Sequence, residues 1–221
     1  MDKLRGKKMD VVWDTEQTLL FLSKRLILNK EIKTVIGDRK LDETTVNLLI
    51  TLFFPTKVQH RDPKANIKVI EFKKWFTTHF QNAAGYISPR DIIHFLSESV
   101  KNEQRTGKSK VSSSPLISEK SVLKAFYTLS EAKFKDIENI SGFHDVLQFI
   151  KSNNMRTFTL NKMKSILGDS DRPDAEVIRQ LKVLESLGFL KSKALRGTRD
   201  SFYYTYKVAP IYSSHWDASY E

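Results

Sequence analysis

Residues 169–209 read DSDRPDAEVIRQLKVLESLGFLKSKALRGTRDSFYYTYKVA, and this stretch decides the fold of the C-terminal part of the chain. Its first half predicts a helix, with Pro173 near the start and Gly188 just past the end, where these residue types are favoured. Two runs of β-like composition follow, FLKSKAL and SFYYTYKVA. The RGTRD between them contains Gly197, which suits the turn of a β-hairpin. The stretch therefore predicts a helix followed by a hairpin.

Two shorter helices are predicted upstream of this stretch. One lies in SGFHDVLQFIKSNN, with Ser141 expected as its N-cap. The other lies in LNKMKSIL, with Thr159 as its N-cap, and ends at Gly168. Three helices followed by a hairpin is the element order of a winged-helix domain, so the sequence predicts such a domain over residues 141–221.

The N-terminal part of the chain is predicted to be helical. Apolar residues at helical spacing predict one helix capped by Asp14 or Thr15 and a second that follows Asp42 and is stopped by Pro55. The stretch FPTKVQHRDPKANIK, residues 54–68, has two prolines and little periodicity, so we expect a loop. A further helix is expected in VIEFKKWFTTHFQN, closed by Gly85.

The clearest helix start lies in YISPRDIIHFLSESVKNEQ. Ser88 is expected to supply the N-cap oxygen and Pro89 to occupy the first helical position. Asp91 falls in the first turn, near the positive end of the helix dipole. The buried face is expected to consist of the apolar residues of this stretch, Ile92, Ile93, Leu96 and Val100.

A polar segment rich in serine and lysine, RTGKSKVSSSP, predicts a flexible linker or long exposed loop at residues 105–115. Ser118 then caps a long helix, ISEKSVLKAFYTLSEAKFKDIENI. We therefore expect a mainly α protein in three parts: a helical bundle over 1–110, a connector helix over 111–140, and a winged-helix domain with a small β-hairpin over 141–221.

Composition limits the class of protein. The 221 residues carry 37 Lys and Arg against 26 Asp and Glu, a formal charge of +11, which favours an acidic partner. Cysteine is absent, which excludes disulfides, a thiol nucleophile and zinc sites with thiolate ligands. No apolar run approaches the roughly 18 residues that cross a bilayer. We expect a soluble, cytoplasmic protein with no membrane partner.

The sequence lacks the motifs of self-contained catalysis. It has no G-x-x-x-x-G-K-[ST] phosphate loop and no G-x-G-x-x-G after a strand, and its eight glycines are scattered singly. Its five histidines form neither H-x-x-x-H nor H-E-x-x-H, so we expect no metal site. The chain alone is expected to have no catalytic residue and no cofactor, and therefore not to be an enzyme.

Basic residues of the predicted winged helix make duplex DNA a candidate partner, because the third helix of this fold enters the major groove and the wing contacts the backbone. Arg and Lys suit phosphate, and Arg and Gln can also reach base edges. The third helix is expected to present these residues to solvent. The candidates on the last two helices and the wing are Lys162, Lys164, Arg172, Arg179, Gln180, Lys182, Lys191, Lys193, Arg196 and Arg199.

Charge also supplies an argument against DNA binding. Residues 141–221 hold 12 basic and 9 acidic residues, so they contribute only +3 of the total charge. The third helix carries Asp174, Glu176 and Glu185, which repel phosphate if they face it. Many winged helices dock proteins instead, so the sequence leaves both DNA contact and protein docking open.

The whole order of segments resembles part of a known protein class. An N-terminal helix of the W-x(n)-L-L-x-x-L-x-x-R type, a helix ending at F-F-P, the segment Y-I-S-P-R-D-I-I-H-F-L and a terminal winged helix follow one another. This order is similar to the part of AAA+-like and STAND-like P-loop ATPases that follows the nucleotide-binding core. It looks most like bacterial P-loop ATPases of unassigned or defence-related role, and more distantly like archaeal origin-recognition initiators. The resemblance implies that residues 1–110 form a helical lid.

The resemblance also implies a role for Arg90. In these ATPases the lid ends in a [GST]-x-P-R-x-[IL]-x-x-[IL]-[IL] helix, whose arginine is the second sensor and reaches the nucleotide phosphates. An arginine in a first helical turn adds charge beside the positive end of the dipole, which suits an anion. The alternative is an exposed first-turn arginine without a ligand. The phosphate loop, the Mg-binding acidic strand and the first sensor would lie upstream of Met1, so ATP and Mg²⁺ are expected only with a P-loop ATPase core as partner.

Three functions remain as expectations from the sequence. The first is the non-catalytic, regulatory and nucleic-acid- or partner-binding C-terminal part of a P-loop ATPase. The second is a free-standing winged-helix DNA-binding regulator, and the third is a protein-interaction adaptor. Residues before Met1 in the gene, or a neighbouring gene with a phosphate loop, would separate the first from the others.

Overall fold

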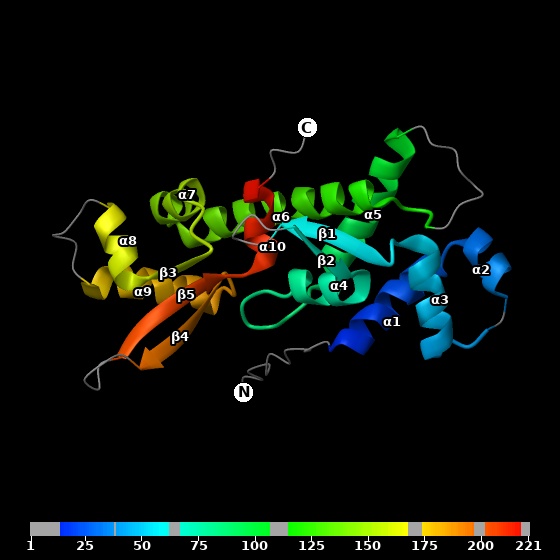
Figure 1. The fold of residues 1–221 in the computed structure, drawn as a ribbon, viewed down its shortest axis with the longest axis horizontal. Helices are drawn as coiled ribbons and strands as arrows, with labels where there is room; N and C mark the ends of the chain where they lie inside the picture. Colours follow the sequence, from blue (N-terminus) through cyan, green and yellow to red (C-terminus); the bar gives the residue numbers. More distant parts are fainter. Residues whose placement is uncertain are drawn as a thin grey trace, which may run out of the picture.

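A computed structural model gives the fold, which is mostly helical, as the sequence predicts, and contains two small antiparallel sheets (Figure 1). It describes residues 14–37, 39–61, 67–106, 115–167, 174–196 and 202–217. The helices are α1 (Thr15–Leu26), α2 (Lys30–Ile36), α3 (Glu43–Phe53), α4 (Phe72–Phe80), α5 (Pro89–Arg105), α6 (Glu119–Ser141), α7 (His144–Ser152), α8 (Leu160–Leu167), α9 (Asp174–Ser186), α10 (Pro210–Ser213) and the 3₁₀ helix η2 (Ser214–Asp217). The strands are β1 (Lys57–Arg61), β2 (Ile67–Glu71), β3 (Thr157–Thr159), β4 (Leu190–Arg196) and β5 (Phe202–Val208).

The helix starts of the N-terminal part follow local capping rules. Asp14 accepts a hydrogen bond from the Gln17 N–H at 2.7 Å, and the Gln17 side chain accepts one from the Asp14 N–H. Asp42 accepts from the Thr45 N–H at 2.8 Å. Of the two candidates, Asp14 and not Thr15 is therefore the N-cap of α1, and α3 follows Asp42 as predicted. The short helix α2 is not among the helices predicted from the sequence.

A β-hairpin replaces the loop that we expect from the sequence at 54–68, so that prediction is wrong. Strands β1 and β2 pair antiparallel, with Val58 opposite Ile70. Among the β1 side chains that the structure describes, only Val58 is buried, and Ile67 and Val69 of β2 are exposed, so these residues lack the burial pattern that marks a strand. The expected helix also starts later, at Phe72, whose N–H donates to the Thr56 carbonyl across the end of the hairpin.

Helix α5 begins where predicted, but its cap and its buried face differ from the prediction. Ser88 occupies the N-cap position without a side-chain cap bond. Ile92 is buried, whereas Ile93 and Val100 are 41% and 43% exposed. The buried positions recur every three or four residues and include polar side chains, which an apolar count overlooks. They are Asp91, Ile92, Phe95, Ser99 and Asn102.

Helix α6 belongs to two hydrophobic cores. Its N-cap Ser118 accepts from the Ser121 N–H, and the Ser118 hydroxyl donates to Glu103 of α5 at 2.6 Å. The first half of α6, up to Leu129, packs with α1, α3, α4 and α5, and the second half, from Phe134, packs with the C-terminal elements. Figure 1 shows this helix running through both halves of the molecule. Residues 107–114, most of the expected linker, lie outside the described residues.

The start of α7 corrects another prediction. Ser141 is the last residue of α6 and not an N-cap; Gly142 follows in the left-handed conformation (φ +67°), and Phe143 takes the N-cap position. The Ser141 hydroxyl instead accepts a hydrogen bond from the Phe143 N–H at 3.2 Å. A tight turn of glycine therefore allows α6 to end one residue later than the sequence suggests.

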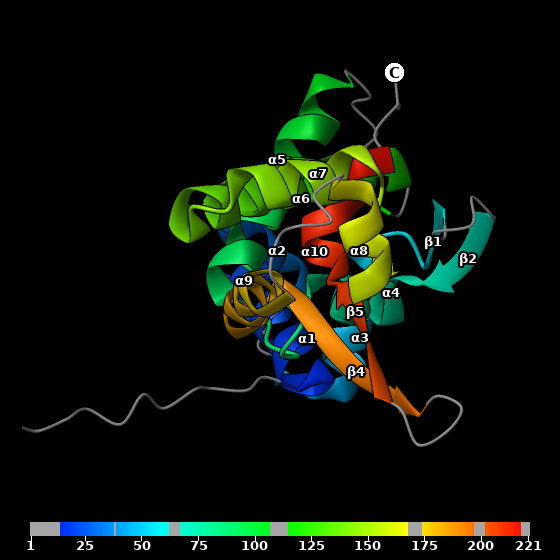
Figure 2. The ribbon, with the colours of Figure 1, turned by 90° about the vertical axis from the view of Figure 1, so that its left-hand side faces the viewer.

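The C-terminal elements run in the order α7, β3, α8, α9, β4 and β5, and the sheet order is β3-β5-β4 (Figures 1 and 2). Thr159 caps α8 by accepting from the Lys162 N–H at 3.2 Å, and the strands β4 and β5 form the predicted hairpin. Gly188 follows α9 with φ +76°, as expected for a glycine after a helix. Gly168, Pro173 and Gly197 lie outside the described residues.

Two contacts fix the C-terminal elements against the N-terminal core. The Ala83 N–H, in the turn after α4, donates to the Gly188 carbonyl at 2.7 Å. Helix α10 follows β5 and returns to pack against both α4 and α6, which places it between the two cores (Figure 1). The two halves are therefore joined by more than the shared α6.

His215 attaches η2 to α6. Its Nδ1 lies 3.1 Å from Ser130 Oγ, and its backbone N–H donates to the same oxygen. Burial lowers the pKa of His215 to about 4, and the nearby Lys151 acts in the same direction. The imidazole is therefore neutral in the folded protein well below the pH at which a free histidine is protonated.

This histidine predicts a pH-dependent stability. Between about pH 6.5 and pH 4 the unfolded chain binds a proton at His215 that the folded protein does not, so the free energy of unfolding decreases as the pH falls. We expect a Tm about 2–4 °C lower at pH 5 than at pH 7, a discounted value because part of the ring reaches solvent. The measurement is thermal unfolding of wild type and His215→Asn, which keeps a hydrogen-bonding group for Ser130. An equal pH dependence in His215→Asn would contradict the assignment.

Candidate nucleic-acid interface

Helix α9 has one buried and one exposed side. Val177, Leu181 and Leu184 are buried at helical spacing and hold the helix against the C-terminal core. Arg179 and Lys182, three residues apart, are exposed together on the other side. The two cations therefore form one stripe on α9, as the sequence predicts.

The structure corrects the predicted position of Gln180. The expected position on the solvent face is wrong, because this side chain is only 8% exposed and its Oε1 is buried without a hydrogen-bond partner among the described residues. Gln180 lies three residues after Val177 and four before Leu184, so helical geometry puts it on the buried side. Gln180 therefore does not belong to the exposed residues of α9.

The acidic residue nearest the end of α9 is held by the sheet. Glu185 Oε1 accepts from the Ser192 N–H at 2.9 Å and from the Ser192 hydroxyl at 2.6 Å. These two bonds use the carboxylate to join α9 to β4. The Glu185 carboxylate is therefore directed toward β4.

The hairpin contributes lysines to the surface. Lys191 and Lys193 of β4 are exposed and share one face of the strand. Lys207 of β5 is exposed as well and stands directly opposite Lys191, but the sequence analysis missed it. The alternation of Thr205 and Lys207 in the second β-like run could have indicated that both lie on one face of a strand. The pairing of Lys207 with Lys191 could not be found in this way, because the sequence does not show the register of the two strands.

The structure describes the side chains of some of the other predicted nucleic-acid-binding residues and not of others. Lys162 is exposed in the first turn of α8. Lys164 and Arg196 lie in α8 and β4, but their side chains are outside the description. Arg172 and Arg199 lie outside the described residues. The described elements thus bring the cations of α9, of the start of α8 and of the hairpin into one unit.

Arg90 belongs to the N-terminal half of the molecule. It is exposed in the first turn of α5, and the adjacent Asp91 points inward to an ion pair with Lys133 of α6, with Oδ2 and Nζ 3.1 Å apart. Tyr212 of α10 is buried nearby: burial, and then the charge of Asp91, raises its pKa. The first turn of α5 is therefore anchored by Asp91 and presents Arg90 to solvent.

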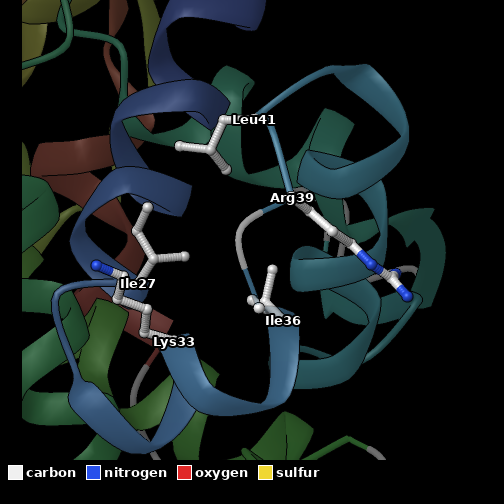
Figure 3. A pocket seen from close by; sticks show the side chains of 6 residues that line it. Ile27, Lys33, Ile36, Arg39 and Leu41 are labelled. Atoms are coloured by element: carbon white, nitrogen blue, oxygen red, sulfur yellow. The ribbon is translucent and has the colours of Figure 1, made fainter.

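A pocket of about 210 Å³ lies between the end of α1, α2 and the segment that precedes α3 (Figure 3). Ile27, Ile36 and Leu41 supply apolar walls, and Lys33 supplies a cation at the edge. Figure 3 shows the Arg39 side chain directed away from Ile27 and Leu41. Carboxylates and histidines are not among the lining residues, so the pocket offers no acid–base pair.

Within the described ranges no group of three or more His, Cys, Asp or Glu side chains is placed to hold a metal ion. Across the same ranges, every helix is too short or too polar to cross a bilayer. Comparisons with protein-family models, with curated proteins and with solved structures gave no match.

Proposed function

We propose that residues 141–221 form a winged-helix unit that binds duplex nucleic acid, and that the chain serves as the non-catalytic, regulatory part of a P-loop ATPase. The element order α7-β3-α8-α9-β4-β5 and the sheet order β3-β5-β4 support the winged-helix assignment. The observation that carries the binding function is the exposed stripe of Arg179 and Lys182 on α9, from which the carboxylate of Glu185 is drawn away to β4.

The expected mode follows from that stripe. A recognition helix enters the major groove, where Arg reads base edges or phosphate and Lys neutralises phosphate. Gln180 is buried and leaves α9 with few groups that discriminate bases. Binding is therefore expected to depend mostly on phosphate charge and to show little sequence preference.

Arg90 is the proposed link to nucleotide. The resemblance of Y-I-S-P-R-D-I-I-H-F-L to an ATPase lid gives this arginine the role of second sensor. Its exposure on the first turn of α5 leaves the guanidinium accessible to the phosphates of a nucleotide held by a core outside residues 1–221. The Asp91–Lys133 ion pair connects that turn to α6, and so to the proposed binding unit.

The test is a salt series of duplex binding. Fluorescence anisotropy with a labelled duplex of about 20 base pairs, between about 50 and 200 mM salt, gives the slope of log K against log salt. Replacing Arg179 and Lys182 together by Gln is expected to lower the affinity. It should also reduce the magnitude of the slope by about 1.8, because it removes two phosphate contacts that contribute about 0.9 each. The matched control is Lys120→Gln with Lys124→Gln, which removes the same charge from the exposed side of α6.

Two outcomes count against this function. Wild-type protein that fails to bind the duplex even at about 50 mM salt would make the unit a protein-docking module. An equal loss in the α6 control would show that total charge, and not the α9 stripe, sets the affinity.

A further inference from the structure

The sheet β3-β5-β4 has an inner and an outer face. Phe158, Leu190, Tyr206 and Val208 point inward and are buried in the C-terminal core, and Ser192 of the same face binds Glu185 of α9. Because side chains alternate along a strand and directly paired residues share a face, the intervening positions form the outer face. Those whose side chains the structure describes are Thr157, Thr159, Lys191, Lys193, Leu195, Thr205 and Lys207.

The outer face places like charges side by side. One row across the three strands reads Thr157, Lys207, Lys191, and the next row reads Thr159, Thr205, Lys193. Lysines directly opposite each other destabilise a sheet. Within the described parts of the chain no carboxylate forms an ion pair with Lys191, Lys193 or Lys207. The folded protein thus retains an unfavourable cationic pair that a bound anion would neutralise.

Hydroxyl groups and a helix start border these lysines. The Thr159 hydroxyl accepts from the Lys162 N–H, so its own hydrogen remains available to donate to an anion. The same contact puts the positive end of α8, with the exposed Lys162, beside the second row of the sheet. The lysines of the sheet and the start of α8 therefore both adjoin the row that holds Thr159.

We propose that this outer face binds a segment of phosphodiester backbone, as a second nucleic-acid surface on the side of the sheet away from α9. Same-face residues on one strand lie about 6.6 Å apart, so Lys191 and Lys193 span roughly the rise of two phosphates of one strand, about 3.4 Å each. Phosphate oxygens accept from lysine and threonine, which are the residue types present. The inference rests on the proposed function for its ligand class but uses none of the α9 residues.

The surface fits phosphodiester better than a membrane. Among the described residues this face presents no exposed large apolar side chain to enter the acyl region, because Leu195 is half-buried. An acidic peptide is the remaining competitor, and its binding is an outcome of the test.

The experiment uses the full chain and three matched pairs of substitutions. They are Lys191→Gln with Lys207→Gln (the sheet pair), Arg179→Gln with Lys182→Gln (the helix pair) and Lys120→Gln with Lys124→Gln (the control pair). Labelled DNA and RNA duplexes of about 20 base pairs are titrated over about 50–200 mM salt. The sheet pair is expected to lose about 0.9 unit of slope per contact, on the order of 50-fold in affinity at about 100 mM salt, and the control pair is expected to change little.

The sheet pair and the helix pair are expected to give different results for a second surface on the sheet and for binding through α9. Weaker binding by the sheet pair, also in the helix-pair background, supports the second surface, and a preference for DNA or RNA then identifies the source of the backbone. Loss with the helix pair alone overturns the inference and leaves the proposed function intact. Loss with the sheet pair alone supports the inference and removes the role of α9. Unchanged binding in both pairs overturns both.

Folding and ligand class have their own controls. The sheet pair is expected to raise Tm, since it removes opposed like charges, and Lys191→Arg with Lys207→Arg should keep the affinity. If the sheet pair does not fold, Lys193→Gln, whose neighbour across the strand is Thr205, repeats the titration with half the change in slope. Polyglutamate that competes as well as duplex DNA at equal charge concentration would overturn the inference in favour of an acidic peptide.

Discussion

Replacing Trp75 by alanine is expected to lower the free energy of unfolding by about 3–5 kcal/mol. The indole is 1% exposed at the centre of the N-terminal core. Its ring centroid lies 5.1 Å from that of Phe126 on α6 and 6.5 Å from that of Phe95 on α5, so the residue joins three helices. Truncation removes the buried area of the ring, its aromatic pairs and the filling of the space between those helices.

Urea unfolding followed by circular dichroism measures this effect. Lys74→Ala, at the exposed neighbouring position on α4, is the control and should change stability by less than about 0.5 kcal/mol. Because α6 belongs to both cores, we also expect one transition. In a background with both Trp13→Phe and Trp75→Phe, where Trp216 is the remaining tryptophan, fluorescence from the C-terminal core should change at the same urea concentration as the helical signal. Two separated transitions would show that the cores unfold independently.

Gly188→Ala is expected to destabilise the protein by about 2–4 kcal/mol. The residue has φ +76°, where an L side chain costs about 1–2 kcal/mol. A Cβ there would also lie 2.6 Å from Asn82 Nδ2 and 3.0 Å from Asn82 Cγ. Asn82 cannot easily withdraw, because its Oδ1 accepts from the N–H groups of Ala84 and Tyr86.

Two variants separate the backbone cost from the clash. Gly142→Ala has a similar φ, +67°, with open space around the added Cβ, so it should show only the backbone cost. In an Asn82→Ala background, Gly188→Ala should fall to that smaller value, which a double-mutant cycle of thermal or urea unfolding measures. Equal effects of Gly188→Ala in both backgrounds would mean that Asn82 does not set the requirement for glycine.

The parts of the fold that the sequence predicts are those set by neighbours along the chain. The caps at Asp14, Asp42 and Thr159 depend on a side chain and an N–H three residues later, so the sequence alone is enough. The β1–β2 hairpin depends on backbone pairing between strands with mostly exposed side chains, which leaves little hydrophobic pattern. Ser141 was misassigned because the turn at Gly142 lets α6 extend one residue further.

The candidate interface shows the same division. The stripe of Arg179 and Lys182 follows from helical spacing, and that expectation is met. Gln180 was misplaced because its polarity outweighed its position between Val177 and Leu184. Lys207 was missed because its importance comes from standing opposite Lys191, and strand register is set by long-range packing.

The length of α6 has a consequence for the position of Arg90 relative to the basic residues of α9. A helix turns by about 100° and advances about 1.5 Å with each residue, so one residue inserted between Leu129 and Phe134 would rotate the C-terminal core by more than a quarter turn around the N-terminal core. The Ala83–Gly188 hydrogen bond and the packing of α10 on α4 would then be lost together. The number of residues in α6 therefore sets the rotation of the C-terminal core about the helix axis, and with it the direction in which the basic residues face relative to Arg90.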